Sequence, residues 1–311
     1  MFQGLAVWIL VLLLSALAGC SLRKYAVNMV GDALVAGNSV YETDDDVELV
    51  GEALPFGLKL VEGLLEESPN HRGLLLTAAR GFVLYSYSTV SGRAEVLEDV
   101  DLDLARALRL RARKLYLRGL AYGVRGLEVS YPGLGERLFL NPEGAVVEVH
   151  NQKREQQDLP FLYWSAAALG LGISVSRNDV AMLARLPEVD AMLERALDLD
   201  ESWNGGALHE FAIQLASSRP GGADYTALAK HYNRVTALSK YPSAGVYVSY
   251  AEAVWLPQQD KPKFRALLEK ALALDPGVDP SRRLVNVLAQ RRARRLLEKI
   301  DDLILDPEEV Q

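Results

Sequence analysis

Cysteine is nearly absent from this chain, which has a single cysteine, Cys20, among its 311 residues. Without a second thiol, the chain can form neither an internal disulfide nor a zinc site built from several cysteines. The folded state must therefore be stabilised by packing, for which a composition that is 50% hydrophobic provides ample material.

Long apolar runs are also scarce. The run at the start, residues 5–18, is apolar except for Ser15, but it is shorter than the roughly 20 residues that a membrane-spanning helix needs. Its length and the small residues after it are typical of a signal peptide. The sequence LAGC at residues 17–20 matches the bacterial lipobox, in which the cysteine is diacylated and the preceding peptide is removed. We therefore expect a signal peptide over residues 1–19 and lipidation of Cys20.

No lysine or arginine precedes this run, and an ordinary secretory signal with a chance cysteine is the alternative interpretation. Two acyl chains give stable anchoring where one does not. Ser21 stands where an aspartate would retain a lipoprotein in the inner membrane, and it favours the outer membrane. The prediction is a lipid-anchored protein at the periplasmic face of a bacterial membrane. Residues 20–30 would be a flexible tether, and residues 20–311 a single domain.

An excess of positive charge is absent as well, because the formal net charge is −7. Binding to nucleic acid therefore has no electrostatic support, and no nucleic-acid partner is expected. The one cluster that could suggest RNA binding is Arg291, Arg292, Arg294 and Arg295. An apolar stripe runs between these arginines and acidic residues follow, which favours a charged, solvated helix flank.

Catalytic and metal-binding motifs are missing. The four histidines are His71, His150, His209 and His231, and the closest two are 22 positions apart, so no helical metal pair exists. Neither a G-x-S-x-G nucleophile turn nor a phosphate-binding loop occurs. The sequence thus predicts a protein that is not an enzyme and needs no cofactor, with an envelope hydrolase of unrecognised type as a minor alternative.

Alternating strand patterns are rare, and the best of them, residues 145–149, is brief. Helical periodicity dominates instead, with apolar residues spaced by three and four over residues 183–199 and 264–274. Clusters of proline and glycine separate such stretches at residues 68–70, 131–135 and 275–280. The fold class predicted is all-α.

A recurring phrase suggests how the helices are joined. An amphipathic helix ends in leucine and small residues, and an acidic or proline-containing turn opens the next helix, at residues 64–70, 196–203, 271–278 and 303–309. Tetratricopeptide repeats join helix pairs in this way. The spacing is irregular, and chance recurrence of a common phrase is the alternative. We expect stacked helix pairs in a degenerate tetratricopeptide-like solenoid with a concave face or a central channel.

Large aromatic residues lie beside small ones. Tyr163 and Trp164 precede the small-residue stretch 165–170, while Tyr250 and Trp255 lie along a second segment and Trp203 opens a third. Small residues let helices approach closely, and large aromatics beside them can line an apolar cavity. Core packing explains any single one of these residues, and only the set suggests a ligand pocket. His209 lies on a predicted helix with Leu208, Phe211 and Leu215 on its buried face, which favours a structural histidine.

Several segments resemble a known family. These are the lipobox, FLYWSAAALGLGISVSRND at residues 161–179, LPEVDAMLERALDLDESWNGGALHEF at 186–211, RPGG at 219–222 and RRLVNVLAQRRARRLLEKIDDL at 282–303. Together they are similar to the TatT family, the T-components of tripartite ATP-independent periplasmic (TRAP) transporter systems. Val285 stands before Asn286 where the family pattern has leucine, and Val287 follows Asn286. The first 150 residues match more loosely.

The resemblance implies a non-catalytic lipoprotein of cryptic tetratricopeptide-like helices. It further implies a homo-oligomer, for which a trimer is the candidate form, with a pore through each subunit. The implied partner is the soluble substrate-binding protein of the transporter, and the implied ligand is apolar or an organic acid. By resemblance, pore-lining roles pass to Tyr163, Trp164, Trp203, His209 and Trp255. An envelope scaffold without a small-molecule ligand remains the alternative function.

Overall fold

The computed structural model describes residues 25–35, 37, 40–150, 158–216, 219, 222–241 and 243–305. The predicted signal peptide, the lipidation of Cys20 and the sorting residue Ser21 lie outside the described residues. Of the predicted tether, residues 25–30 are helical.

All regular structure in the described residues is helical, which confirms the all-α prediction. The elements are α2 (Val40–Thr43), α3 (Val47–Glu67), α4 (Arg72–Tyr85), η2 (Ser86–Ser91), α5 (Gly92–Val96), α6 (Leu102–Glu128), α7 (Leu134–Leu140), α8 (Pro142–Val146), α9 (Asp158–Ser174), α10 (Val180–Leu183), α11 (Leu186–Asp200), α12 (Trp203–Ala216), α13 (Tyr225–Leu238), α14 (Ala244–Tyr250), η3 (Ala251–Trp255), α15 (Lys261–Leu272), η4 (Pro280–Arg282), α16 (Arg283–Glu298) and α17 (Ile300–Leu303). None of these helices combines the length and the hydropathy that a membrane span requires.

Aspartate side chains open many of the helices. The carboxylates of Asp46, Asp101 and Asp260 each accept a hydrogen bond from the backbone N–H three residues later, at 2.9–3.0 Å. Such caps satisfy backbone donors that have no partner within the helix. These three aspartates lie outside the recurring phrase; after its first segment, Nδ1 of His71 takes the same role at the start of α4 and accepts from the N–H of Leu74 at 3.2 Å.

The predicted joints are largely confirmed. Residues 68–71 separate α3 from α4, residues 201–202 separate α11 from α12, and the turn after α15 leads to η4 and α16. The fourth predicted joint, residues 303–309, lies partly outside the described residues, which end at residue 305. The weak strand pattern at residues 145–149 is not a strand, because Ala145 and Val146 belong to helix α8 and both are buried.

Helices α6 and α9 form the central pair of the larger core. The small residues of α9 permit close contact, as the sequence suggested, and α6 contributes glycines to the same interface. A Cβ atom added at Gly123 would overlap the hydroxyl of Ser165, and one at Gly126 would overlap the ring of Phe161. Helix α6 also contacts η2 and α5, so it lies between α9 and these short segments along part of its length.

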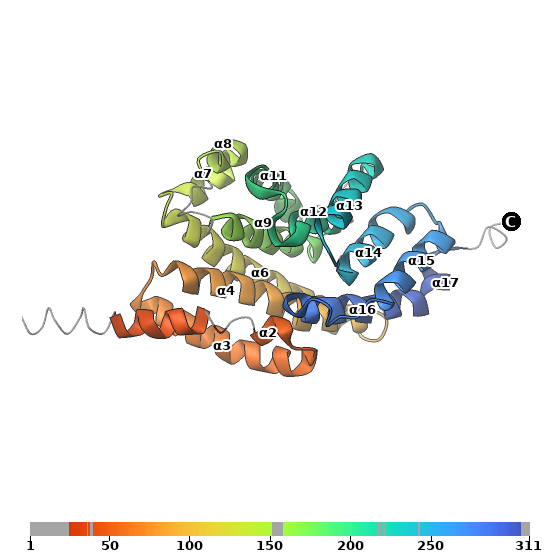
Figure 1. The fold of residues 1–311 in the computed structure, drawn as a ribbon, viewed down its shortest axis with the longest axis horizontal. Helices are drawn as coiled ribbons and strands as arrows, with labels where there is room; N and C mark the ends of the chain where they lie inside the picture. The colour runs from red at the N-terminus through yellow and green to blue at the C-terminus, as the bar shows by residue number, and fades with distance from the viewer. Residues whose placement is uncertain are drawn as a thin grey trace, which may run out of the picture.

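The chain closes on itself (Figure 1). Helices α3, α4, α6, α9, α11 and α12 pack in succession, α14 to α16 follow, and α16 returns to lie against α2 and α3. Arg291 of α16 pairs with Glu48 of α3, with 2.9 Å between Nη2 and Oε2, although 243 positions separate them in sequence. Because the last long helix meets the first, the helices enclose a central space.

Candidate functional site

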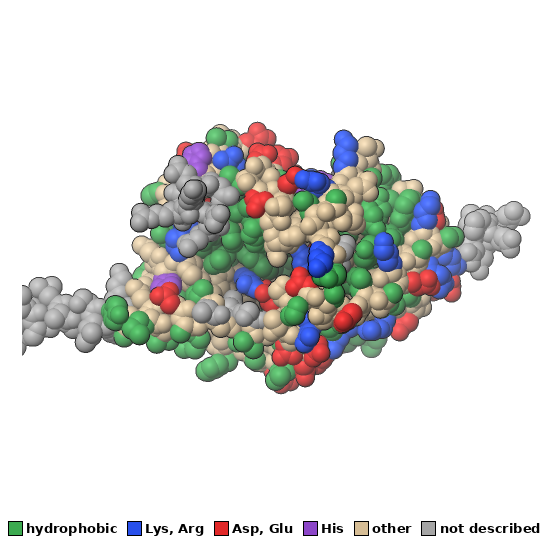
Figure 2. All heavy atoms as spheres, viewed as in Figure 1, with side chains coloured by type: hydrophobic (Ala, Val, Ile, Leu, Met, Phe, Trp, Pro, Cys, Tyr) green, Lys and Arg blue, Asp and Glu red, His purple; other side chains and the backbone are tan. Residues whose placement is uncertain are grey.

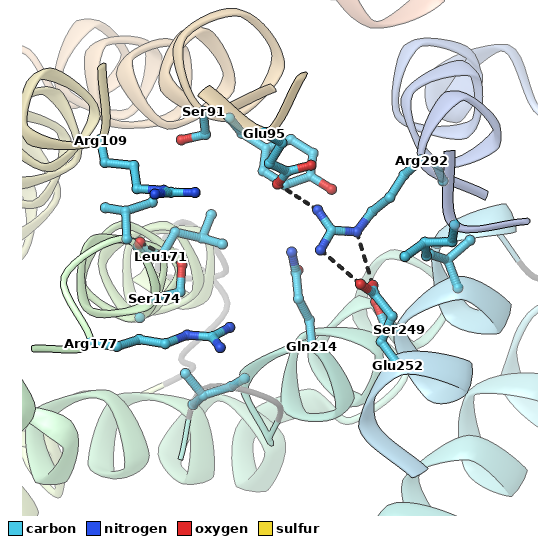
Figure 3. A pocket seen from close by; sticks show the side chains of 18 of the residues that line it. Ser91, Glu95, Arg109, Leu171, Ser174, Arg177, Gln214, Ser249, Glu252 and Arg292 are labelled. Carbon is cyan, nitrogen blue, oxygen red and sulfur yellow. Dashed lines mark hydrogen bonds and ion pairs between the residues drawn. The ribbon is translucent and has the colours of Figure 1, made fainter. Parts of the chain in front are cut away.

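A cavity of about 550 Å³ lies in this central space. Its walls come from α6, α9, α12, α14 and α16 and from the short segments η2, α5 and η3. Tyr87 is among the residues that line it. Ser91, Ser174, Gln214 and Ser249 also line it (Figure 3). The volume falls in the usual range for sites that bind small molecules.

A second cavity of about 580 Å³ adjoins the first. Helix α3 forms one side of it, through residues such as Gly51 and Pro55, and η2, α5 and α16 form the others. Four residues line both cavities: Tyr87, Glu95, Arg292 and Arg295. These four side chains therefore stand between the two cavities.

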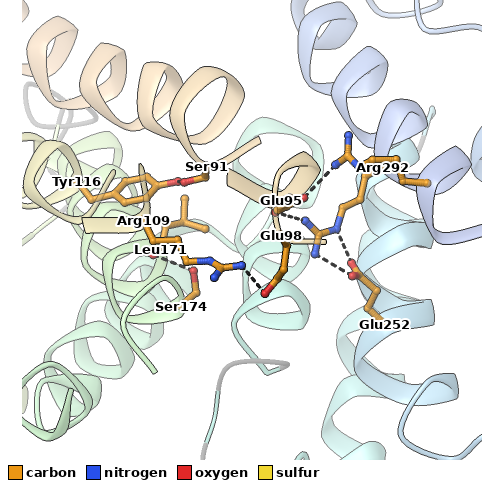
Figure 4. A network of polar contacts seen from close by, with 10 residues as sticks. Ser91, Glu95, Glu98, Arg109, Tyr116, Leu171, Ser174, Glu252 and Arg292 are labelled. Carbon is orange, nitrogen blue, oxygen red and sulfur yellow. Dashed lines mark hydrogen bonds and ion pairs between the residues drawn. The ribbon is translucent and has the colours of Figure 1, made fainter. Parts of the chain in front are cut away.

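Arg292 is the centre of an ionic network at this boundary (Figure 4). Its Nε and Nη2 atoms donate to the two carboxylate oxygens of Glu252, at 2.9 and 2.8 Å, and its Nη1 donates to Glu95 at 2.5 Å. Nη2 of Arg295 donates to the other oxygen of Glu95, at 2.9 Å. The carboxylate of Glu252 is the main reason that the pKa of Arg292 is raised well above its ordinary value, against the opposing effect of burial. We call Arg292, Glu95, Glu252 and Arg295 the Arg292 bridge.

The bridge corrects one expectation from the sequence. Arg294 is exposed, as predicted for a solvated helix flank, but Arg291, Arg292 and Arg295 are half-buried and paired with carboxylates. Those carboxylates come from α3, η3 and α5, which are distant from α16 in sequence. Periodicity identifies the apolar face of a helix, but it does not reveal which distant charges meet the polar face.

The central cavity carries more positive than negative charge. Its lining contains five basic side chains, Arg109, Arg177, Arg292, Arg295 and Lys299, against three acidic ones, Glu95, Glu98 and Glu252. Arg109 pairs with Glu98 at 2.6 Å. Arg177 is exposed at the cavity and has no acidic partner within the described part of the chain. This local surplus contrasts with the net charge of −7 for the whole chain.

Hydroxyl groups supply part of the remaining polar lining, together with the amides of Asn178 and Gln214. The hydroxyls of Ser91 and Tyr116 are 3.3 Å apart, and Ser174 donates to the carbonyl of Leu171 at 2.8 Å. The hydroxyl of Tyr87 has no hydrogen-bond partner among the residues described. Burial is the main cause that raises the pKa of Tyr87 to about 12, so this hydroxyl stays protonated and can donate to a ligand.

Two π-helical segments help to form the site. η2 continues α4 and carries Tyr87 and Ser91, whereas η3 continues α14 and carries Glu252. π-helical turns are rare and occur often at functional sites. In η2, the hydroxyls of Ser86 and Ser88 donate to backbone carbonyls four residues earlier, at 2.6 and 2.8 Å. The serine-rich sequence SYSTVS was the only sequence signal for this feature, because serine hydroxyls compete for helix carbonyls.

Three of the predicted site residues form one aromatic cluster. The ring of Tyr163 lies 5.0 Å from that of Trp164 and 4.9 Å from that of Trp203, centre to centre. Tyr163 also contacts Phe211 at 6.1 Å, and Phe211 lines the central cavity. The cluster therefore supports the cavity wall from behind.

The other three predicted residues lie elsewhere. Tyr250 and Trp255, with ring centres 6.3 Å apart, pack with Tyr232 in a separate cluster. His209 is buried and lies beside His231, with 2.8 Å between the two Nδ1 atoms. None of the six predicted residues is among those that line the two cavities. Their ligand contact remains a prediction.

The histidine pair escaped the sequence analysis, because 22 positions separate the two rings in the chain. Burial lowers the pKa of both, and for His209 the carboxylate of Glu201 partly offsets that effect. At 2.8 Å, one Nδ1 must carry a proton and donate a hydrogen bond, which the unprotonated Nδ1 of the other ring accepts. No group of three or more His, Cys, Asp or Glu residues suited to a metal ion occurs in the described ranges.

Comparisons with known proteins agree with the resemblance noted in the sequence. A model of the family described as "TRAP transporter T-component" matches residues 43–304. A protein of Treponema pallidum (strain Nichols), described only as uncharacterized, is 30% identical over 309 residues, which cover 93% of this chain and 94% of that protein. T-components are accessory parts of transporters and not enzymes. The chain therefore belongs to the TRAP transporter T-component (TatT) family.

Proposed function

We propose that the protein is a non-catalytic accessory component of a TRAP-type transport system. In this role it binds the substrate-binding protein of that system and holds a small-molecule ligand in the central cavity. The observation that carries the proposal is a cavity of about 550 Å³ enclosed by helices of a T-component, with polar groups directed into it.

The lining favours an organic acid over an apolar ligand. Five basic and three acidic side chains face the cavity, and Arg177 has no carboxylate partner in the described ranges. A ligand carboxylate can accept hydrogen bonds from a guanidinium and from the Tyr87 hydroxyl, whereas an apolar ligand would leave these donors without partners. Tyr163, Trp164 and Trp203 would stabilise this wall through Phe211.

The remaining parts of the proposal concern the setting of the protein. Residues 1–19 would be removed and Cys20 lipidated, so that the protein faces the periplasm from a membrane, the outer one by the criterion of Ser21. Residues 20–311 would form one domain of stacked, tetratricopeptide-like helix pairs around a central pore. The assembled form would be a homo-oligomer such as a trimer.

An envelope scaffold without a small-molecule ligand is the second candidate. The observation that favours it is an exposed apolar strip on α3, where Leu49, Phe56 and Leu60 are 55%, 76% and 41% exposed. Exposed apolar residues on one helix face suit a contact with another protein. A scaffold would need this strip but not the cavity.

Affinity purification tests the proposal. The full-length chain, tagged at its C-terminus, would be extracted from its own envelope in mild detergent, and bound proteins identified by mass spectrometry. An unrelated globular domain with the same lipid anchor and tag is the control. Recovery of a TRAP substrate-binding protein with the chain but not with the control is the expected result. Recovery of envelope assembly factors alone would favour the scaffold.

A further inference from the structure

We infer that the two cavities are two halves of one passage and that the Arg292 bridge is the gate between them. The cavities, of about 550 and 580 Å³, are both lined by Tyr87, Glu95, Arg292 and Arg295. Of these four residues, three belong to the bridge. A solute in one cavity therefore meets the bridge before it can reach the other.

The bridge ties together three walls of the enclosed space. Arg292 comes from α16, Glu95 from α5 and Glu252 from η3 (Figure 4). With Nε and Nη2 on Glu252 and Nη1 on Glu95, the guanidinium uses three of its nitrogen donors on two carboxylates. Such planar, multidentate pairing fixes the orientation of the arginine across the boundary.

The same geometry allows the bridge to open. When Arg292 swings away, Glu95 keeps its second partner, because Arg295 donates to its other oxygen at 2.9 Å. Of the two carboxylates, only Glu252 then needs a new partner, and the protonated hydroxyl of Tyr87 lies at the same boundary. The guanidinium of Arg292, which lines both cavities, would be solvated in one of them. Two short π-helical segments carry Tyr87 and Glu252, and π-helical turns occur often at functional sites. Because Arg295 and Tyr87 can replace part of the contacts that Arg292 makes, the bridge can have a closed state and an open state.

The surface over the central space also carries charge of both signs. Figure 2 shows blue and red side chains close together over the middle of this face, between the helices around α9 and α12 and helix α16. The inference rests on the proposed function in one respect: the gate would control the movement of the proposed ligand. The following test needs neither ligand nor partner, so the gate and the proposed function can fail separately.

Cross-linking through the boundary tests the gate. Ser249 lines only the central cavity and Thr89 only the second, so Ser249→Cys and Thr89→Cys place one thiol on each side. Cys20→Ser removes the other thiol from the full-length chain, which is studied in detergent. Bifunctional thiol reagents of graded length are then added, and the cross-linked fraction is measured by mass spectrometry.

Arg292→Ala should raise the cross-linked fraction about tenfold or more. Each ~1.4 kcal/mol by which the closed state loses stability raises the ratio of open to closed molecules tenfold. Arg292→Lys, which keeps the charge but cannot span both carboxylates, should give a smaller rise and serves if the alanine variant does not fold. Arg291→Ala is the matched control, because Arg291 pairs with Glu48 outside the bridge. Equal fractions in the folded Arg292 and Arg291 variants, or full cross-linking with the bridge intact, would overturn the inference.

Discussion

Gly126 offers the sharpest test of how α6 packs against α9. A Cβ atom placed on Gly126 would lie only 2.5 Å from Cδ1 of Phe161, and closer still to Cε1 of the same ring. Phe161 is 1% exposed and cannot move into solvent. Overpacking of a core costs about 1–3 kcal/mol, and an overlap this deep falls at the upper end of that range. Alanine favours a helix over glycine by ~1 kcal/mol, which offsets part of this cost. Gly126→Ala should thus lower the free energy of unfolding by about 2 kcal/mol.

Gly63 provides the matched control. Gly63 lies inside helix α3 and is exposed to solvent, and a Cβ atom added there would meet nothing within 4 Å. Gly63→Ala should therefore stabilise the protein by about 0.5–1 kcal/mol through helix propensity alone. Thermal unfolding followed by circular dichroism would separate the two variants by about 6 °C, at roughly 2 °C for each kcal/mol. A Gly126→Ala protein as stable as Gly63→Ala would refute the close packing of α6 on α9.

Two further predictions concern buried charge. Asp158, with a side chain 1% exposed, pairs with Arg72, and Asp158→Ala should cost about 3 kcal/mol in urea unfolding because it leaves Arg72 without that carboxylate. Asp103→Ala, at a side chain 94% exposed, should cause no measurable change, and equal effects would contradict the buried pair. For His209 and His231, NMR titration should give midpoints below the ordinary value of about 6.5, since burial lowers both pKa values. A lowered histidine pKa means that stability falls as the pH drops from about 6.5 through the folded-state values, and midpoints at or above 6.5 would contradict the burial of this pair.

The sequence was informative wherever local physics decides the structure. Apolar spacing of three and four predicted helices at residues 183–199 and 264–274, where α11 and α15 are found. The small residues that follow Trp164 predicted close helix packing, which the contact of Gly123 with Ser165 confirms. These signals act within one or two turns, so a single sequence contains them.

The sequence was uninformative where distant segments meet. Arg292 looked like a solvated residue, because nothing near it in the chain shows that Glu95, 197 positions away, will reach it. His209 and His231 looked unrelated for the same reason. Closure of α16 onto α3 creates the central cavity, and this closure depends on the summed geometry of all the helices between them. The sequence therefore indicated the fold class and the family but not the lining of the site.

The central claim is that the cavity holds a small organic ligand, and native mass spectrometry of the purified full-length chain tests it most directly. A bound mass of an organic acid should accompany the chain. Ser249→Trp, which fills the central cavity, should abolish that mass. Leu140→Trp, on a side chain 71% exposed, adds comparable bulk at the surface and should retain it. A chain that carries no ligand in any variant, or one that keeps its ligand after Ser249→Trp, would contradict the claim.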